Sequence, residues 1–259
     1  MFVKTLKPFL FIALVMAVVS LACMGGNAAP TQEPPPSSPT EAPQQPEQPQ
    51  QPEQPIQTEA PSAPPAQEFF TEEFEGDISN WSYFNILGSK DTNESALSLE
   101  TNDGYLVFDI TTKNLYTYVM YDPFTYKDVA IELRAENRGT NNNAISMVCR
   151  YSDEGWYEIN IQNSGLYNIL AATYNPSGDI VYSRLADGGS NKIKVGKDVN
   201  EYKMICKERK ITLFINGFET RNIEDNQYVL RDGQVGFSVS SFSDPTVKVE
   251  VDWVKISEP

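Results

Sequence analysis

The chain has 259 residues, with 20 Lys and Arg against 35 Asp and Glu, so its formal net charge is −15. This balance disfavours nucleic acid and anionic lipid as partners, because phosphate binding needs clustered cations. Histidine is absent. Its absence excludes an imidazole general base, imidazole metal sites and Ser-His nucleophilic machinery. Any catalysis would therefore rest on carboxylates, lysine, tyrosine or a calcium ion.

The beginning of the chain has the pattern of an export signal. Lys4 and Lys7 precede an apolar run over residues 9–19, which is short for a membrane span, and a small-residue tail ends at Cys23. The tail resembles the lipobox of bacterial lipoproteins, except that Leu21 stands two residues before the cysteine instead of three. We predict a signal peptide over residues 1–22 and a lipidated Cys23 that anchors the mature protein.

The alternative is an ordinary signal peptide followed by an incidental cysteine. Both interpretations place the protein outside the cytoplasm. The predicted location is extracytoplasmic, at the bacterial membrane or cell surface, with the bilayer contacted through the anchor only.

The segment after the anchor is a low-complexity stretch. Residues 27–68 hold 13 of the chain's 18 prolines and contain no Lys or Arg. The block over residues 46–55, PEQPQQPEQP, nearly repeats itself, which is typical of a disordered or polyproline-like tether. At about 3.1 Å per residue, such a tether would reach about 130 Å when fully extended. We predict that residues 23–68 form a linker that holds a following domain away from the lipid surface.

Assigning Cys23 to lipid leaves a single pair of cysteines, Cys149 and Cys206. Both lie in apolar segments with strand-like alternation, over residues 144–151 and 202–207. In an oxidising compartment we predict a disulfide between neighbouring strands. Two buried free thiols are the alternative.

Residues 69–259 predict one all-β domain. Apolar and polar residues alternate over 129–136, 145–151 and 157–161, as in strands with one buried face. Turn residues at 163–165 and at Asn216-Gly217 predict two hairpins. Roughly a dozen strands with this spacing indicate a two-sheet antiparallel sandwich.

A series of short motifs along this domain resembles a known family. In chain order they are FFTEEF (69–74), Trp81, VCRY (148–151), GWY (155–157), GLY (165–167), LFING (213–217), DGQVG (232–236) and VDWV (251–254). Their order is similar to that of a concanavalin A-like jelly roll of the laminin-G or glucanase type. The laminarinase-like and keto-disaccharide-hydrolase-like domains of bacterial surface proteins are the most similar members. The resemblance implies two antiparallel sheets, one of them concave, with a groove that binds carbohydrate in many members; the fold alone does not assign that function.

The catalytic pattern of the glucanases in this family is incomplete here. In them, three acids share one strand as Glu-x-Asp-x-Glu or Glu-x-Asp-x-x-Glu, whereas the nearest stretch here is Glu158-Ile159-Asn160-Ile161-Gln162. An amide cannot donate and recover a proton, so this strand cannot run a two-carboxylate mechanism. We predict no catalytic residues. The alternative is a glycoside hydrolase or lyase that uses carboxylates from separate strands, such as Glu132 and Glu158.

The same strand suits binding, because alternation places one aromatic and three polar side chains on the face opposite Tyr157, Ile159 and Ile161. Two arginines are expected to project outward on strands alongside. The predicted ligand-binding residues are Trp156, Glu158, Asn160, Gln162, Arg134 and Arg150. The alternative is that Trp156 caps the edge of the core and the polar groups are merely solvated.

Two further features concern calcium and a tyrosine-rich segment. Asp103, Asp153 and Asp187 lie in loops, and calcium occurs often in this family, but their spacing is not that of a multi-ligand loop. We therefore expect no cofactor, with calcium as the alternative. A tyrosine-rich segment could face a ligand or pack at the core and rim, and packing is the default. Its members are Tyr116, Tyr118, Tyr121 and Tyr126.

The sequence thus predicts a membrane-anchored, non-catalytic binding module whose partner is carbohydrate or envelope polysaccharide. A glycoside hydrolase or lyase is the first alternative. A structural or protein-interaction module of the cell envelope is the second.

Overall fold

The computed structural model describes residues 65–259. The predicted signal peptide over residues 1–22, Cys23 and most of the predicted linker over residues 23–68 lie outside the described residues. Within residues 65–259, no helix is long and apolar enough to cross a membrane.

The described part of the chain consists of 15 strands and one short 3-10 helix, η1 (Glu94–Ala96). The strands are β1 (Phe70–Glu72), β2 (Trp81–Leu87), β3 (Leu97–Asn102), β4 (Tyr105–Ile110), β5 (Leu115–Tyr126), β6 (Val129–Asn137), β7 (Asn143–Ser152), β8 (Gly155–Gln162), β9 (Leu166–Tyr174), β10 (Ile180–Gly189), β11 (Val199–Lys207), β12 (Lys210–Ile215), β13 (Phe218–Glu224), β14 (Gly233–Ser241) and β15 (Val247–Ser257). The all-β prediction is confirmed.

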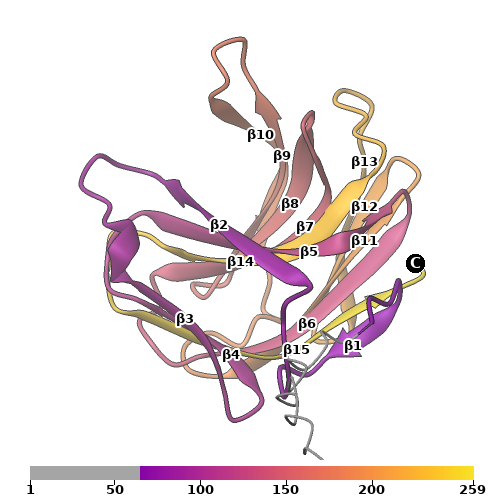
Figure 1. The fold of residues 1–259 in the computed structure, drawn as a ribbon. Coiled ribbons are helices and arrows are strands. Elements are labelled where there is room, and N and C mark those ends of the chain that lie inside the picture. The colour runs from indigo at the N-terminus through magenta and orange to yellow at the C-terminus, as the bar shows by residue number, and fades with distance from the viewer. Residues whose placement is uncertain (1–64) are drawn as a thin grey trace, which may run out of the picture. The chain divides into compact units, whose positions relative to one another are not determined.

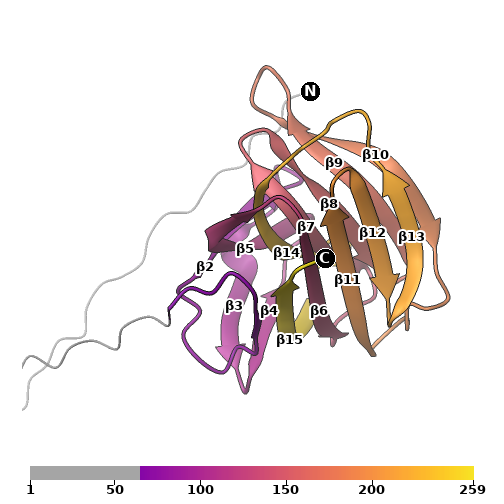
Figure 2. The same cartoon turned by 90° about the vertical axis from the view of Figure 1, so that its right-hand side faces the viewer.

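The strands form two antiparallel sheets that pack face to face (Figures 1 and 2). Sheet A has eight strands in the order β13-β12-β11-β6-β15-β4-β3, with β1 paired to β15 as well. Sheet B has seven strands in the order β10-β9-β8-β7-β14-β5-β2. Neighbours in each sheet are often distant in sequence, as in a jelly roll, so the predicted two-sheet sandwich is confirmed.

The core lies between the sheets and is built by the period-2 alternation that the sequence shows. Because successive side chains of a strand point to opposite faces, every second residue of β6, β7 and β8 is directed inward. The inward residues on these three strands are Val129, Ile131, Leu133, Ala135, Ile145, Met147, Cys149, Tyr157, Ile159 and Ile161, all within the buried core.

The two predicted hairpins are present. Residues 163–165 join β8 to β9, and Asn216-Gly217 joins β12 to β13. Asn216 and Gly217 have φ values of 49° and 80°, so this turn needs two residues that tolerate positive φ.

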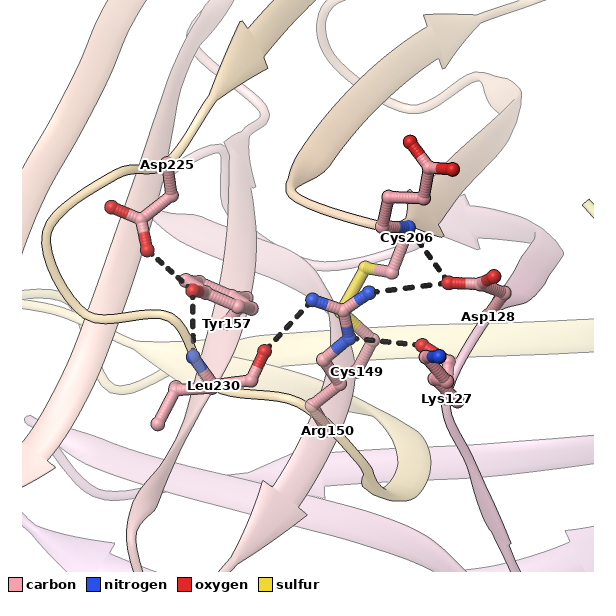
Figure 3. Close-up of a disulfide and its surroundings, with 9 residues drawn as sticks. Lys127, Asp128, Cys149, Arg150, Tyr157, Cys206, Asp225 and Leu230 are labelled. Atoms are coloured by element: carbon pink, nitrogen blue, oxygen red, sulfur yellow. Dashed lines mark hydrogen bonds and ion pairs between the residues drawn. A yellow bond between two sulfur atoms is a disulfide. The ribbon is translucent and has the colours of Figure 1, made fainter.

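The predicted disulfide between Cys149 and Cys206 is confirmed, with a Cα–Cα distance of 6.7 Å across a sequence separation of 57. The expected position between neighbouring strands is wrong, because Cys149 lies on β7 of sheet B and Cys206 on β11 of sheet A. Both side chains face the core and are fully buried. The bond therefore ties one sheet to the other (Figure 3).

Two tyrosines of the tyrosine-rich segment fasten the first described residues to the sandwich. The Tyr121 hydroxyl donates to the Gln67 carbonyl at 2.7 Å and accepts from the Gln67 amide at 3.1 Å. The Tyr126 hydroxyl donates to the Glu68 carbonyl at 2.7 Å. Both rings are buried in the core, so packing is confirmed as their role.

Candidate functional site

The outer face of sheet B carries a cavity of about 350 Å³. Sheet B is strongly curved, with β2 at one edge and β9 and β10 rising at the other (Figure 1). The cavity is lined by Ile86, Gly88, Tyr116, Tyr118, Glu158, Asn160, Gln162, Leu170, Tyr182 and Phe242. We call it the sheet B cavity.

Strand β8 supplies the polar floor of this cavity. Alternation along β8 turns Glu158, Asn160 and Gln162 to the outer face, as predicted, and all three line the cavity. Trp156 shares that face but is fully buried. The indole lies beside Glu158 and is covered by the rings of Tyr118 and Tyr182, so it is not open for a ligand to stack on.

Glu158 is a buried carboxylate with only 3% of its surface exposed. Its Oε2 accepts from the Tyr118 hydroxyl at 2.8 Å and from Trp156 Nε1 at 3.3 Å. Its Oε1 accepts from the Ser146 hydroxyl at 2.7 Å. Burial raises the pKa of Glu158, while these hydrogen bonds to the ionised form oppose the rise.

Two tyrosines from opposite ends of sheet B meet above this carboxylate. The hydroxyls of Tyr118 on β5 and Tyr182 on β10 are 3.0 Å apart, although four strands separate β5 from β10 in the sheet. Curvature of the sheet brings the two edges toward each other. Small residues leave room for the rings, because Tyr118 is in register with Ser238, and Tyr182 with Ala172.

The rings around Glu158 pack on one another. Phe84 stacks on Tyr118 with ring centroids 5.1 Å apart and planes 5° apart. Trp156 meets the rings of Tyr118 and Tyr182 edge-on at 5.8 Å and 6.0 Å. Such contacts fix the positions of the two hydroxyls, because each ring loses its rotational freedom.

Two buried hydroxyls lie on this outer face without a hydrogen-bond partner in the described part of the chain, those of Ser238 and Ser240. They are in register with Tyr118 and Tyr116 on β5. Small side chains here are explained by the tyrosines that lie beside them.

The predicted position of Arg134 is wrong. Arg134 lies on β6, which belongs to sheet A, and it binds Asp252 at 2.8 Å and Glu201 at 3.9 Å on the outer face of that sheet. Glu132 lies on the same strand and pairs with Lys203 at 3.4 Å. Alternation shows that these side chains point outward, but it cannot show from which sheet. Glu132 and Glu158 therefore face opposite sides of the sandwich and cannot act as a catalytic pair.

The predicted position of Arg150 is also wrong. Its strand, β7, does lie beside β8, but a bulge between Cys149 and Ser152 interrupts the register, and Arg150 has a φ of 57°. The side chain is 2% exposed and donates to the Lys127 carbonyl at 3.0 Å and the Leu230 carbonyl at 2.8 Å (Figure 3). Arg150 thus braces loops and does not face the sheet B cavity.

Asp103, Asp153 and Asp187 do not come together, and the expected loop position of Asp187 is wrong, because Asp187 lies on β10 and is in register with Asn168. Within residues 65–259, no group of three His, Cys, Asp or Glu side chains could hold a metal ion. Asp187 lies 3.9 Å from Arg184, both of them exposed.

The chain matches a known protein family over most of its length. A family model described as the 3-keto-alpha-glucoside-1,2-lyase-like domain matches residues 70–252. The chain belongs to this family. The resemblance to keto-disaccharide-hydrolase-like domains is therefore confirmed.

Solved structures share the jelly-roll fold of this lyase-like domain at low identity. A β-1,3-1,4-glucanase (lichenase) from a mouse hindgut metagenome is 13% identical, with a TM-score of 0.55 over 74% of this chain and 100% of that chain. A glycoside hydrolase family 16 endo-glucanase from Bacteroides ovatus is 15% identical, with a TM-score of 0.52 over 73% and 99%. A LamA variant from Z. galactanivorans is 13% identical, with a TM-score of 0.51 over 72% and 97%. No curated protein sequence matches the chain.

Two members of the site in this lyase-like domain, Tyr182 and Ser146, were not singled out by the sequence patterns. Ser146 points outward on β7 and is in register with Asn160 on β8. Recognising that these two strands form a hairpin would therefore have predicted that Ser146 lies beside Asn160 in the site. Tyr182 carries no comparable signal, because its contact with Tyr118 depends on the curvature of the whole sheet.

Proposed function

We propose that the sheet B cavity binds carbohydrate. The observation that carries this proposal is the lining itself, in which tyrosine rings stand beside two amides and a hydrogen-bonded carboxylate. Rings offer apolar faces to the C–H surface of a sugar, and amides bind its hydroxyls as donors and acceptors. A concave site with a few convergent polar groups is the usual form of a small-molecule site.

The comparisons support a glycan as the ligand class. The Bacteroides ovatus endo-glucanase was solved in complex with G4G3G-2F-DNP, and the LamA variant in complex with laminaritriose and laminaritetraose. Those ligands belong to those proteins. They identify glucan oligosaccharides as suitable first ligands for this cavity.

The site supports binding better than hydrolysis. Glycoside hydrolysis by the usual routes needs two carboxyl groups, about 5 to 9.5 Å apart. Glu158 is the only carboxylate among the residues that line the sheet B cavity. We therefore propose that the domain is a non-catalytic binding module. Its proposed partners include envelope polysaccharides.

A carbon–oxygen lyase is the second candidate, because the family is described as 3-keto-alpha-glucoside-1,2-lyase-like and an elimination needs only one general base. Glu158 is the group that would serve, acting through the Tyr118 hydroxyl. Release of sugar from a glycan by the wild-type protein, lost in Glu158→Gln, would establish this candidate and contradict the binding proposal.

The binding proposal is tested with Tyr116→Ala in the full, oxidised chain. Tyr116 lines the cavity, whereas Tyr83 on β2 is 58% exposed and does not, so Tyr83→Ala is the matched control. Calorimetry with laminaritriose should show affinity about tenfold lower in Tyr116→Ala, since loss of a ring contact removes about 1 to 1.5 kcal/mol. Tyr83→Ala should bind as the wild type does.

Two results would count against carbohydrate binding at this site. Equal affinity in both variants would place the ligand elsewhere on the molecule. Absence of binding to a panel of glucans, together with capture of an envelope protein, would favour the protein-interaction alternative.

We also propose that the domain acts at the extracytoplasmic side of a bacterial membrane. The sequence pattern around Cys23 supports a lipid anchor there, and the proline-rich composition of residues 23–68 supports a spacer. Lipid contact through the anchor alone agrees with the net negative charge of the chain.

A further inference from the structure

The hydrogen bonds around Glu158 all run in one direction. A carboxylate only accepts, so Tyr118, Ser146 and Trp156 must each direct a proton toward it. Each hydroxyl has a single proton. The hydroxyls of Tyr118 and Ser146 have therefore used theirs and can only accept from their next neighbour.

The groups that hydrogen-bond to Tyr118 and Ser146 also donate toward Glu158. Tyr182 must donate to the Tyr118 oxygen across the 3.0 Å contact, since the Tyr118 proton is already directed at Glu158. Asn160 Nδ2 donates to the Ser146 oxygen at 3.0 Å. As a consequence, the Tyr182 oxygen and the Asn160 carbonyl oxygen are left as acceptors toward the cavity.

The opposite end of the cavity has the opposite polarity. The Gln162 carbonyl accepts from the Ser164 hydroxyl at 3.2 Å, which leaves the Gln162 amide N–H groups as donors. No Lys or Arg is among the residues that line the cavity, and Glu158 is its only charged group. An anionic ligand would thus meet a negative charge without a compensating cation.

From this arrangement we infer that the sheet B cavity selects neutral sugars through two free hydroxyls, one that donates to the Tyr182 oxygen and one that donates to the Asn160 carbonyl oxygen, and rejects sugars in which either position cannot donate or carries a negative charge. This inference rests on the carbohydrate-binding function proposed above. It assigns to Glu158 the role of orienting the donors, and to Tyr182 and Asn160 the role of contacting the ligand.

The buried carboxylate of Glu158 sets the direction of the hydrogen bonds between it and the cavity. An amide in its place should therefore reverse some of these hydrogen bonds. The glutamine of Glu158→Gln has one donor end and one acceptor end. The position of Oε2 also accepts from Trp156 Nε1, which can only donate, so the donor end of the glutamine faces Ser146. The proton of Ser146 then turns to the Asn160 carbonyl oxygen, and the Asn160 amide N–H groups turn into the cavity. One acceptor toward the ligand thus becomes a donor, while the Tyr182 oxygen remains an acceptor.

The test uses laminaritriose and its monodeoxyfluoro derivatives. Fluorine is close to a hydroxyl in size but cannot donate, so it isolates the loss of the proton from any loss of fit. In the wild type, fluorine at one position should lower the affinity about tenfold, the effect of one lost hydrogen bond at a buried acceptor. In Glu158→Gln the fluorine penalty should fall to about threefold or less at the position that donates to Asn160.

Two controls accompany this experiment. Tyr174→Phe removes a hydroxyl from β9 that does not line the cavity, and it should retain the wild-type preference. A trisaccharide with glucuronic acid in place of one glucose should bind the wild type at least tenfold more weakly than laminaritriose.

The outcomes separate the two proposals. Binding of laminaritriose with every fluorinated position tolerated within twofold overturns this inference and leaves carbohydrate binding intact. Fluorine penalties that are equal in the wild type and in Glu158→Gln at every position also overturn it. Absence of binding to laminaritriose contradicts the proposed function for glucans and removes the inference with it.

Discussion

Glu158 shows at the scale of one residue how burial and hydrogen bonding oppose each other at a charged group. Its burial disfavours the ionised form, and hydrogen bonds from Ser146, Tyr118, Trp156 and Asn160 favour it. Burial has the stronger effect, so the pKa of Glu158 in the folded protein is raised. Its ionised form therefore destabilises the fold relative to a solvated glutamate.

The sign of this effect gives a pH-dependent prediction. Because the folded pKa of Glu158 exceeds the unfolded value of about 4.3, the protonated side chain contributes most to stability below that pH, and this contribution is lost as pH rises through the folded pKa. Each pKa unit by which the folded and unfolded values differ changes the free energy of unfolding by about 1.4 kcal/mol. Relative to Glu158→Gln, the wild type should thus lose free energy of unfolding between pH 4 and pH 8 in urea titrations.

The matched control for this prediction is Glu154→Gln, which removes a negative charge from an exposed position in the β7–β8 turn. A difference between wild type and Glu158→Gln that stays constant from pH 4 to pH 8 would contradict the account of Glu158.

At the scale of elements, the bulged end of β7 holds three segments together (Figure 3). Arg150 donates to the carbonyls of Lys127 and Leu230, and its guanidinium lies 3.5 Å from Asp128. The neighbouring disulfide from Cys149 ties β7 to β11 in the other sheet. Loops that follow β5 and β13 are thus fixed by a strand from the middle of sheet B.

Arg150→Met is expected to be far more damaging than Arg134→Met. Arg150 is buried, so its removal leaves two carbonyls without their donor, at a cost of about 3 to 5 kcal/mol. Arg134 makes its ion pairs with a side chain 41% exposed, and pairs of this kind contribute about 0 to 1 kcal/mol. Chemical denaturation of both variants measures the contrast, and equal losses would show that Arg150 is not a brace.

At the scale of the whole molecule, curvature of sheet B makes the site. The hydroxyls of Tyr118 and Tyr182 belong to β5 and β10, which a flat sheet would hold about 24 Å apart at the usual strand spacing of about 4.8 Å. Because the sheet is coiled, the two hydroxyls instead lie within hydrogen-bond distance of each other. The site therefore forms only in the complete sandwich, in which sheet A packs against the inner face of sheet B.

The proposed anchor concerns the same scale, since it determines where the sandwich works. Cys23→Ser should release the protein from the membrane fraction of a bacterial host and abolish incorporation of labelled palmitate, because the acyl chains supply the membrane affinity. Laminaritriose binding should be unchanged, because the proposed binding groups all belong to the sandwich strands and the loops that line the sheet B cavity. Retention of the variant in the membrane fraction would favour an ordinary signal peptide.

Features that depend only on neighbouring residues could be predicted from the sequence alone. The alternation along residues 157–161 predicted which side chains of β8 share a face, and Asn216-Gly217 predicted a hairpin, because strand pleat and turn geometry are local. The order of motifs predicted the jelly roll, and the count of cysteines predicted the disulfide partners.

Only the tertiary structure decided which outward faces belong together. Alternation is the same in either sheet, so it could not separate Arg134 on sheet A from Glu158 on sheet B. A bulge shifts the register by one residue, so a regular pattern through Arg150 misplaced its side chain. Tyr182 meets Tyr118 because twist and curvature accumulate over the six paired strands from β10 to β5, and no short segment of the sequence encodes this accumulated curvature.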